Sequence, residues 1–128
     1  MSWRWISKPA LLLLHAESLA EHGGSPGLRD EGLLDSALAR PQNLLAYGEP
    51  DAAALAAAYG SGVARNHPFI DGNKRAALLS IGLFLHLNGW RLTASQADTT
   101  RTMLALAAGD LPEDALADWL RRHAAPRA

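Results

Sequence analysis

Cysteine is absent from this sequence, and aromatic residues make up only 6% of it. Without cysteine, the chain can form neither disulfides nor thiolate metal sites. An excess of charge of one sign is also lacking, because 12 lysines and arginines stand against 13 acidic residues. Proteins that bind nucleic acids usually carry a basic face that neutralises phosphates, so we expect no direct nucleic-acid partner.

The apolar run near the start of the chain is too short to cross a membrane. It covers residues 10–14 and follows Arg4 and Lys8, as in a signal sequence. A membrane-spanning helix, however, needs about 20 apolar residues. His15 and Glu17 continue the same helical pattern directly after the run, so we expect a cytoplasmic protein without a membrane segment.

Apolar residues, in contrast, are plentiful enough to build a core. The 128 residues are 48% hydrophobic, which predicts one globular domain over residues 1–128 that needs no disulfide or metal. Helix caps and helix breakers recur along the chain, and strand patterns are almost missing. These features predict an all-α fold, a compact bundle of about six helices around a buried central helix.

Caps and stops give the expected bounds of the helices. The first three are expected from Ser7 to Gly23, from Asp30 to a stop at Arg40 and Pro41, and from Asp51 to about Arg65. The fourth, from about Asn73 to Leu87, is apolar almost all round. A helix of that kind is buried on most sides, so we expect it to be the central helix.

The C-terminal third continues the helical pattern after one short break. Residues 90–93 are expected to form an extended link, and a fifth helix to run from about Ser95 to Ala108. Asp110 and Glu113 have the spacing of a capping box, which predicts the start of a sixth helix.

Residues 67–75 concentrate polar groups where the fourth helix begins. A helix start offers unpaired backbone N–H groups and the positive end of the helix dipole, and it therefore binds phosphates well. Gly72 lets the backbone approach a ligand closely. Lys74 and Arg75 place two positive charges where the dipole disfavours them. Because an anion would offset that repulsion, we expect a phosphate site made by Gly72, Asn73, Lys74 and Arg75.

Two further side chains in this segment suggest chemistry as well as binding. Asp71 is an odd choice beside cations unless a Mg²⁺ ion bridges it to the phosphates; alternatively, it is only a helix cap. The imidazole of His67 suits a general base for a hydroxyl; alternatively, it is an ordinary loop residue. Phe69 is expected to anchor the loop in the core.

The run from His67 to Arg75 resembles the signature of the Fic/Doc family, His-Pro-Phe-x-(Asp/Glu)-Gly-Asn-(Gly/Lys)-Arg, at every fixed position. Residues 23–42 are also similar to the family's Doc ("death on curing") toxins. The resemblance implies the all-helical Fic/Doc fold and a transferase that uses ATP and Mg²⁺. It implies the roles of base for His67, metal ligand for Asp71 and anion hole for residues 72–75, with Arg75 also counted as catalytic.

Two positions bear on which reaction the resemblance implies. Family members that transfer AMP carry Gly at the position of Lys74 and a second Arg at the position of Leu78, whereas Doc toxins carry Lys and lack that Arg. Doc toxins move the γ-phosphate of ATP to a threonine of the translation elongation factor EF-Tu. We therefore favour a protein kinase over an AMP-transferring enzyme, although Pro68 and Gly72 follow the wider family and keep AMPylation as the alternative. A non-catalytic binding module is a second alternative.

The resemblance also bears on regulation. Many family members are inhibited by a helix with Ser/Thr-x-x-x-Glu, and no Ser or Thr here has Glu four residues on. An inhibitor would thus be another chain, which for Doc toxins is an antitoxin of the Phd type. Outside the motif, His15 and His22 are expected to pack or face solvent. Arg29 is expected to be a surface residue and Asp30 a helix cap; alternatively, their loop approaches the active site.

Overall fold

The structure is a computed structural model that describes residues 2–127. Its elements are α1 (Lys8–His22), α2 (Glu31–Ala46), α3 (Ala52–Asn66), α4 (Asn73–Leu87), β1 (Trp90–Leu92), α5 (Gln96–Ala107), α6 (Glu113–Arg122) and β2 (Ala124–Pro126). The predicted all-α class with about six helices is confirmed. Within the described residues, no helix combines the length and the apolar character that crossing a membrane requires.

Side-chain caps begin four of the helices. Ser7, Asp30, Asp51 and Ser95 each accept a hydrogen bond from the backbone N–H three residues further on, at the starts of α1, α2, α3 and α5. A cap of this kind satisfies one of the N–H groups that the first helical turn leaves unpaired. The sequence therefore located these four starts to within one residue.

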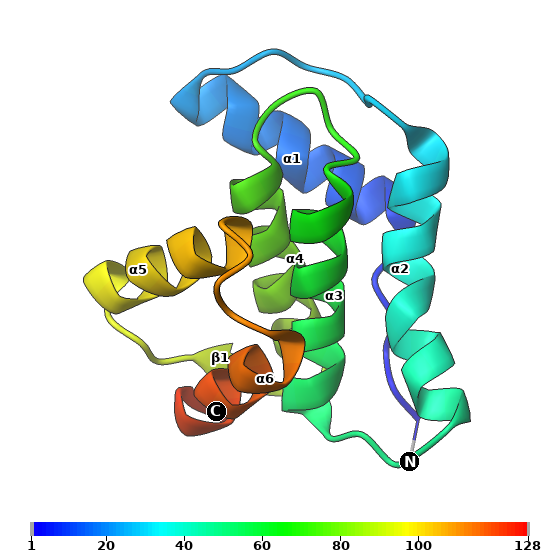
Figure 1. Cartoon of the computed structure of the whole chain (residues 1–128), viewed down its shortest axis with the longest axis vertical. Helices are drawn as coiled ribbons and strands as arrows, with labels where there is room; N and C mark the ends of the chain where they lie inside the picture. Colours follow the sequence, from blue (N-terminus) through cyan, green and yellow to red (C-terminus); the bar gives the residue numbers. More distant parts are fainter. Residues whose placement is uncertain (1, 128) are drawn as a thin grey trace.

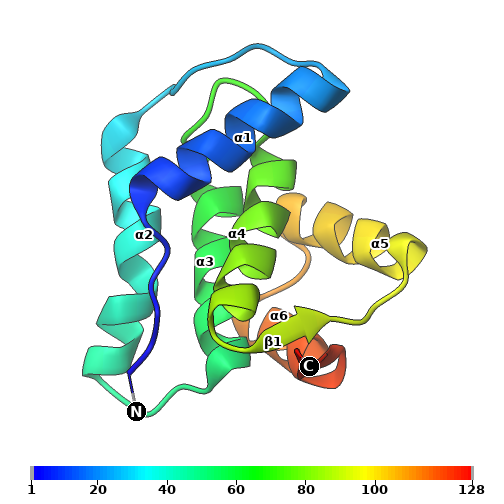
Figure 2. The same cartoon turned by 180° about the vertical axis from the view of Figure 1, so that it is seen from behind.

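A central helix is present, but it is α3 and not α4 as the sequence suggested. Twelve of the 15 residues of α3 are buried, against six of 15 in α4. Figures 1 and 2 show α3 with α2 on one side and α4 on the other, and α6 across its lower end. Alanine and glycine make α3 narrow enough to be enclosed, whereas the larger side chains of α4 cover it and leave one flank half-exposed.

The helices around α3 come unusually close at two glycines. A Cβ atom built on Gly60 would lie 2.5 Å from Cδ1 and 2.8 Å from Cγ1 of Ile81 on α4. One built on Gly62 would lie 3.3 Å from the Cβ of Ala37 on α2. At Gly60 these distances leave no room for a side chain, and at Gly62 a methyl group would fit only if its neighbours shifted by a small distance. The spacing of α3 from α4 therefore depends on glycine, and its spacing from α2 is favoured by glycine.

The predicted end of the second helix is wrong, because α2 continues through Pro41 to Ala46. A proline inside a helix removes a hydrogen bond and costs about 3 kcal/mol. However, Leu34, Ala37 and Pro41 form one buried stripe of α2. Pro41 is itself part of this stripe, and the packing of the stripe against α3 outweighs the missing hydrogen bond.

The C-terminal region departs from the sequence prediction in two ways. The capping box is wrong, since Pro112 occupies the cap of α6 without a side-chain hydrogen bond, and Glu113 instead forms an ion pair with Arg40 of α2. The extended link at residues 90–93 is partly a strand, because β1 pairs antiparallel with β2 near the C-terminus. Strand pairing between such distant segments leaves no local pattern to read.

Polar contacts fix the N-terminal end of α3. Asp51 caps α3 and also accepts hydrogen bonds of 2.7 and 2.9 Å from Arg121 of α6. These bonds hold the pKa of the Asp51 carboxyl below its ordinary value.

The hydroxyl of Tyr59, in the middle of α3, accepts a hydrogen bond from the backbone N–H of Ile6, and burial raises the pKa of Tyr59. Trp119 belongs to the core, and three further tryptophans pack against it: Trp3, Trp5 and Trp90.

The contact at Gly60 leads to a stability prediction. Gly60→Ala should lower the free energy of unfolding by about 1–3 kcal/mol, because the new methyl group overlaps the side chain of Ile81. Gly82→Ala on α4 is the matched control. Its Cβ would meet nothing within 4 Å, so the variant should gain about 0.5–1 kcal/mol from reduced backbone entropy. Urea unfolding of both variants checks the pair, and a gain at Gly60 would contradict the tight packing described.

Candidate active site

The loop that carries the motif begins at an unusual backbone conformation. His67 ends α3 in the left-handed region, with φ 48° and ψ 56°. In residues 2–127 it is the one non-glycine residue with a positive φ. Gly72, with φ 75°, closes the loop and begins α4. Left-handed backbone costs most residues about 1–2 kcal/mol, so contacts elsewhere must hold His67 in place.

Phe69 anchors the loop, as the sequence predicted. Its side chain is 1% exposed, and its ring stacks on the imidazole of His15 with 3.7 Å between ring centroids. His15 is buried and lies on α1, where its Nε2–H donates a 2.8 Å hydrogen bond to the backbone oxygen of Asp71. The expectation that His15 packs is confirmed, and its contact with the motif is a feature that the sequence did not reveal.

The side chain of Asn73 also holds the loop together. Its Oδ1 accepts a hydrogen bond from Phe69 N–H, and its Nδ2 donates to Phe69 O, each at 2.9 Å. Both polar atoms of the amide are therefore bonded to Phe69, and one N–H of Nδ2 remains. For an anion, Asn73 also offers its backbone N–H, together with those of Lys74 and Arg75 in the first turn of α4.

Asp71 is exposed and is not the cap of α4, so the alternative reading as a helix cap is wrong: Gly72 occupies the cap. Its Oδ1 accepts from the adjacent Gly72 N–H at 2.8 Å, and its Oδ2 accepts from Ser25 N–H at 3.2 Å. These bonds orient the carboxylate and leave one lone pair on each oxygen. The described residues hold no group of three or more His, Cys, Asp or Glu side chains suited to a metal. A single oriented carboxylate fits Mg²⁺ that takes its other ligands from phosphate and water.

The two cations of the motif have no acidic partner in the described part of the chain. Nη1 of Arg75 lies 3.2 Å from Nε2 of His22, at the end of α1. Lys74 and Arg75 are exposed and border a cavity of about 300 Å³ against α5. Its other lining residues are Leu78, Gln96, Thr99, Thr100 and Met103.

The imidazole of His67 lies at a second cavity, of about 420 Å³, between the end of α3 and the segment that joins α5 to α6. Ser61, Arg65 and Leu106 are among its lining residues. The ring is exposed and makes no hydrogen bond within residues 2–127. The structure thus places the candidate base at one end of the motif loop and the candidate phosphate site at the other, each open to solvent.

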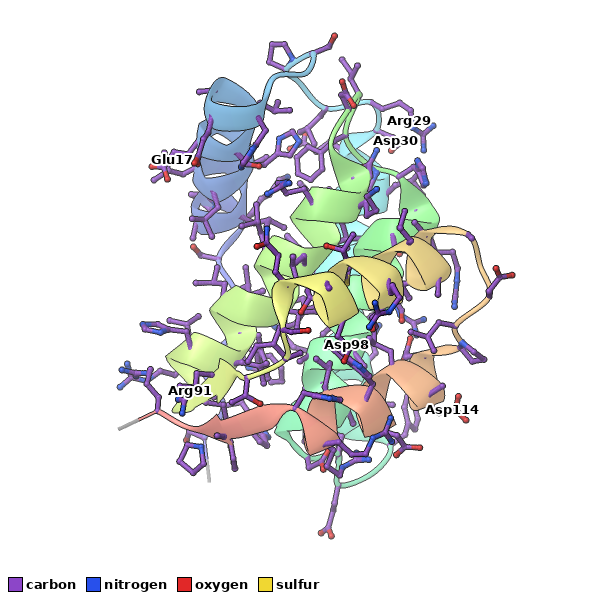
Figure 3. The ribbon with its side chains drawn as sticks, turned by 90° about the vertical axis from the view of Figure 1, so that its left-hand side faces the viewer. Glu17, Arg29, Asp30, Arg91, Asp98 and Asp114 are labelled. Carbon is purple, nitrogen blue, oxygen red and sulfur yellow. The ribbon has the colours of Figure 1, made fainter. Side chains whose placement is uncertain are left out.

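Residues 24–30, between α1 and α2, run antiparallel to the motif loop and bind it through the backbone. Ile70 N–H donates to Gly27 O at 3.1 Å, and the N–H groups of Arg29 and Asp30 both donate to Pro68 O. The side chain of Arg29 donates to backbone oxygens at the end of α3. Arg29 is exposed, as expected, and its side chain also binds the end of α3; Asp30 caps α2, as expected. Figure 3 shows both residues beside the motif loop.

Comparisons with known proteins agree with this arrangement. Residues 5–85 match the family model described as the Fic/DOC family. The chain is 38% identical over 122 residues to "Protein kinase doc" of Escherichia phage P1, covering 93% of this chain and 94% of that protein. It is 42% identical over 119 residues to "Toxin Doc" of Mycolicibacterium smegmatis, covering 88% of this chain and 89% of that protein.

The double hydrogen bond of Asn73 predicts a stability effect. Asn73→Ala should lower the free energy of unfolding by about 1–3 kcal/mol, because it leaves the N–H and the oxygen of the buried Phe69 unpaired. Asn43→Ala, at an exposed position of α2, should change it by less than about 0.5 kcal/mol. Urea unfolding checks both variants, and equal effects would mean that the amide of Asn73 contributes nothing specific.

Proposed function

Because the chain belongs to the Fic/Doc family, we propose that it is a Doc-type toxin with protein kinase activity. It transfers the γ-phosphate of ATP to a threonine or serine hydroxyl of a protein, which we infer to be a translation elongation factor of the EF-Tu type. The names of the two relatives, a protein kinase and a toxin, support this reading. Such a target lies in the cytoplasm.

His67 acts as the base in this proposal. Its imidazole is exposed, free of hydrogen bonds to the described residues, and open to a cavity of about 420 Å³ that admits a side chain of the target. It accepts the proton of the hydroxyl as the hydroxyl oxygen bonds to the γ-phosphorus. The bond from that phosphorus to the oxygen bridging the β- and γ-phosphates breaks, and ADP leaves.

The start of α4 holds the phosphates. Backbone N–H groups of the first turn and the positive end of the helix dipole face the anion. Arg75 and Lys74 supply two charges that no carboxylate within residues 2–127 neutralises. Asp71 is the ligand that would hold Mg²⁺ at the phosphates, where the ion neutralises charge on the transferred group. Gly72 permits the close approach of the backbone to the ligand.

One observation favours phosphate transfer over AMP transfer: the cavity beside Arg75 is lined by Leu78 and Met103. These two side chains offer a nucleobase an apolar surface within an otherwise polar lining, and Gln96 at the same cavity can hydrogen-bond to its edge. We infer that a nucleobase in this cavity directs the terminal phosphate along the start of α4 toward His67. AMP transfer would instead direct the outer phosphates past Arg75 to Leu78, which offers no positive charge.

We further propose that an antitoxin of the Phd type restrains this enzyme in trans. The chain contains no Ser/Thr-x-x-x-Glu segment, so inhibition by such a helix requires a second protein.

Labelled ATP separates the candidate functions. Purified protein with Mg²⁺ and a bacterial lysate should label EF-Tu from γ-labelled ATP and not from α-labelled ATP. His67→Asn should reduce this transfer by about 10² to 10⁴-fold, as expected for a lost general base, and asparagine accepts the left-handed backbone. His86→Ala, at an exposed position of α4, is the control. Transfer of label from α-labelled ATP alone would establish AMPylation. If no label is transferred and the protein also does not bind ATP·Mg²⁺, it is a non-catalytic binding module.

The proposed position of the nucleobase predicts the effect of a positive charge in the cavity beside Arg75. Leu78→Arg should lower transfer from γ-labelled ATP about tenfold or more, because the guanidinium would replace an apolar surface that the nucleobase contacts. Transfer of label from the α position should rise, since the new cation can hold outer phosphates. Leu78→Met keeps the lining apolar and should behave as the native protein. An unchanged rate of γ-phosphate transfer in Leu78→Arg would show that the nucleobase binds elsewhere.

A further inference from the structure

The left-handed turn at His67 needs support that the turn itself does not provide. α3 ends there, so its last carbonyl oxygens have no partner within the helix. His67 is also the one non-glycine residue of 2–127 with a positive φ, a conformation that persists only where the surroundings enforce it. Because this backbone sets the direction of the imidazole, whatever holds the turn also aims the candidate base.

Arg29 holds both carbonyls of the turn with one guanidinium group. Its Nε donates to the backbone oxygen of His67 at 2.7 Å, and its Nη2 donates to the backbone oxygen of Asn66 at 2.8 Å. Both hydrogen bonds are charge-assisted, which makes them stronger than neutral ones. A cation is also favoured at this position because the C-terminal end of a helix carries partial negative charge.

The backbone that carries the guanidinium is itself fixed to the motif loop. Arg29 N–H donates to Pro68 O at 2.7 Å, and Asp30 N–H donates to the same oxygen at 3.1 Å. The carboxylate of Asp30 caps α2 at Leu33. Within residues 2–127, no acidic side chain pairs with Arg29, so the hydrogen bonds of its side chain go to the turn alone.

We propose that Arg29 is a positioning residue for His67: its forked contact fixes the left-handed turn and thereby aims the imidazole at the acceptor hydroxyl. Arg29 acts through the backbone of His67 and does not contact the substrate. Lysine cannot replace it, because an ammonium lacks the planar pair of donors that meets two carbonyls at once. The kinetic consequence of this inference rests on the proposed function, whereas the structural consequence does not.

The kinetic test compares Arg29→Ala and Arg29→Lys with Arg91→Ala. Arg91 is an exposed residue of β1 that lies at the opposite end of the molecule from Arg29 (Figure 3). At saturating ATP·Mg²⁺, both Arg29 variants should transfer label about 10–100-fold more slowly, the effect of a misplaced reacting group. The ATP concentration that gives half the maximal rate should change less than about twofold, because Arg29 does not contact the nucleotide. A tenfold change would correspond to a loss of about 1.4 kcal/mol in binding. Arg91→Ala should match the native protein.

Two kinetic outcomes would overturn the inference. An unchanged rate in both Arg29 variants would show that the turn does not need the guanidinium. A loss of rate that disappears at high ATP concentration would show that Arg29 binds the nucleotide directly and does not position the base.

A structural test decides whether Arg29 holds the turn at His67, and it does not depend on the proposed function. If the native protein transfers no label, the proposed function fails, but this test can still be made. In Arg29→Ala, hydrogen exchange at the amides of His67 and Phe69 should accelerate at least about tenfold, since opening of the loop needs less free energy. Exchange within α6 should stay as in Arg91→Ala. If Arg29→Ala does not fold, Arg29→Lys is measured in its place. Native exchange rates at both amides would exclude a positioning role.

Discussion

The burial of Phe69 is the contact on which the arrangement of the candidate site depends. Its ring lies in the core against His15 of α1, and its two backbone polar groups are both bonded to the side chain of Asn73 on α4. One residue of the loop is thereby joined to helices on either side. With that point fixed, His67 and Asp71 can face solvent on a short loop without disordering it, because neither side chain has to anchor the loop in the core.

The sequence predicted the elements that are specified locally and missed those specified by distant contacts. Caps such as Ser7 and Asp51 act within three residues, so they are visible in the chain, and the motif is contiguous. The continuation of α2 through Pro41 depends on packing against α3. The central position of α3 depends on its narrowness, which a count of apolar residues does not measure because it favours the larger side chains of α4.

The same distinction explains which residues of the site escaped sequence reasoning. His15 lies 56 positions from the backbone oxygen it binds, and Arg29 lies 38 positions from the residue whose oxygen it binds. Both contacts end on backbone oxygens, which every residue type possesses. No pairing of side chains therefore marks them in the chain. The sequence singled out Asn73 as part of the phosphate site, but it did not reveal that the side chain of Asn73 holds the loop through Phe69.

The backbone pairing of residues 24–30 with the motif loop connects that surface segment to the turn that carries the imidazole of His67. None of residues 24–30 is among those that line the two cavities. A small molecule that displaced this segment would release the turn at residue 67 and leave the candidate phosphate site vacant. Such an allosteric ligand would not compete with an anion bound at the start of α4.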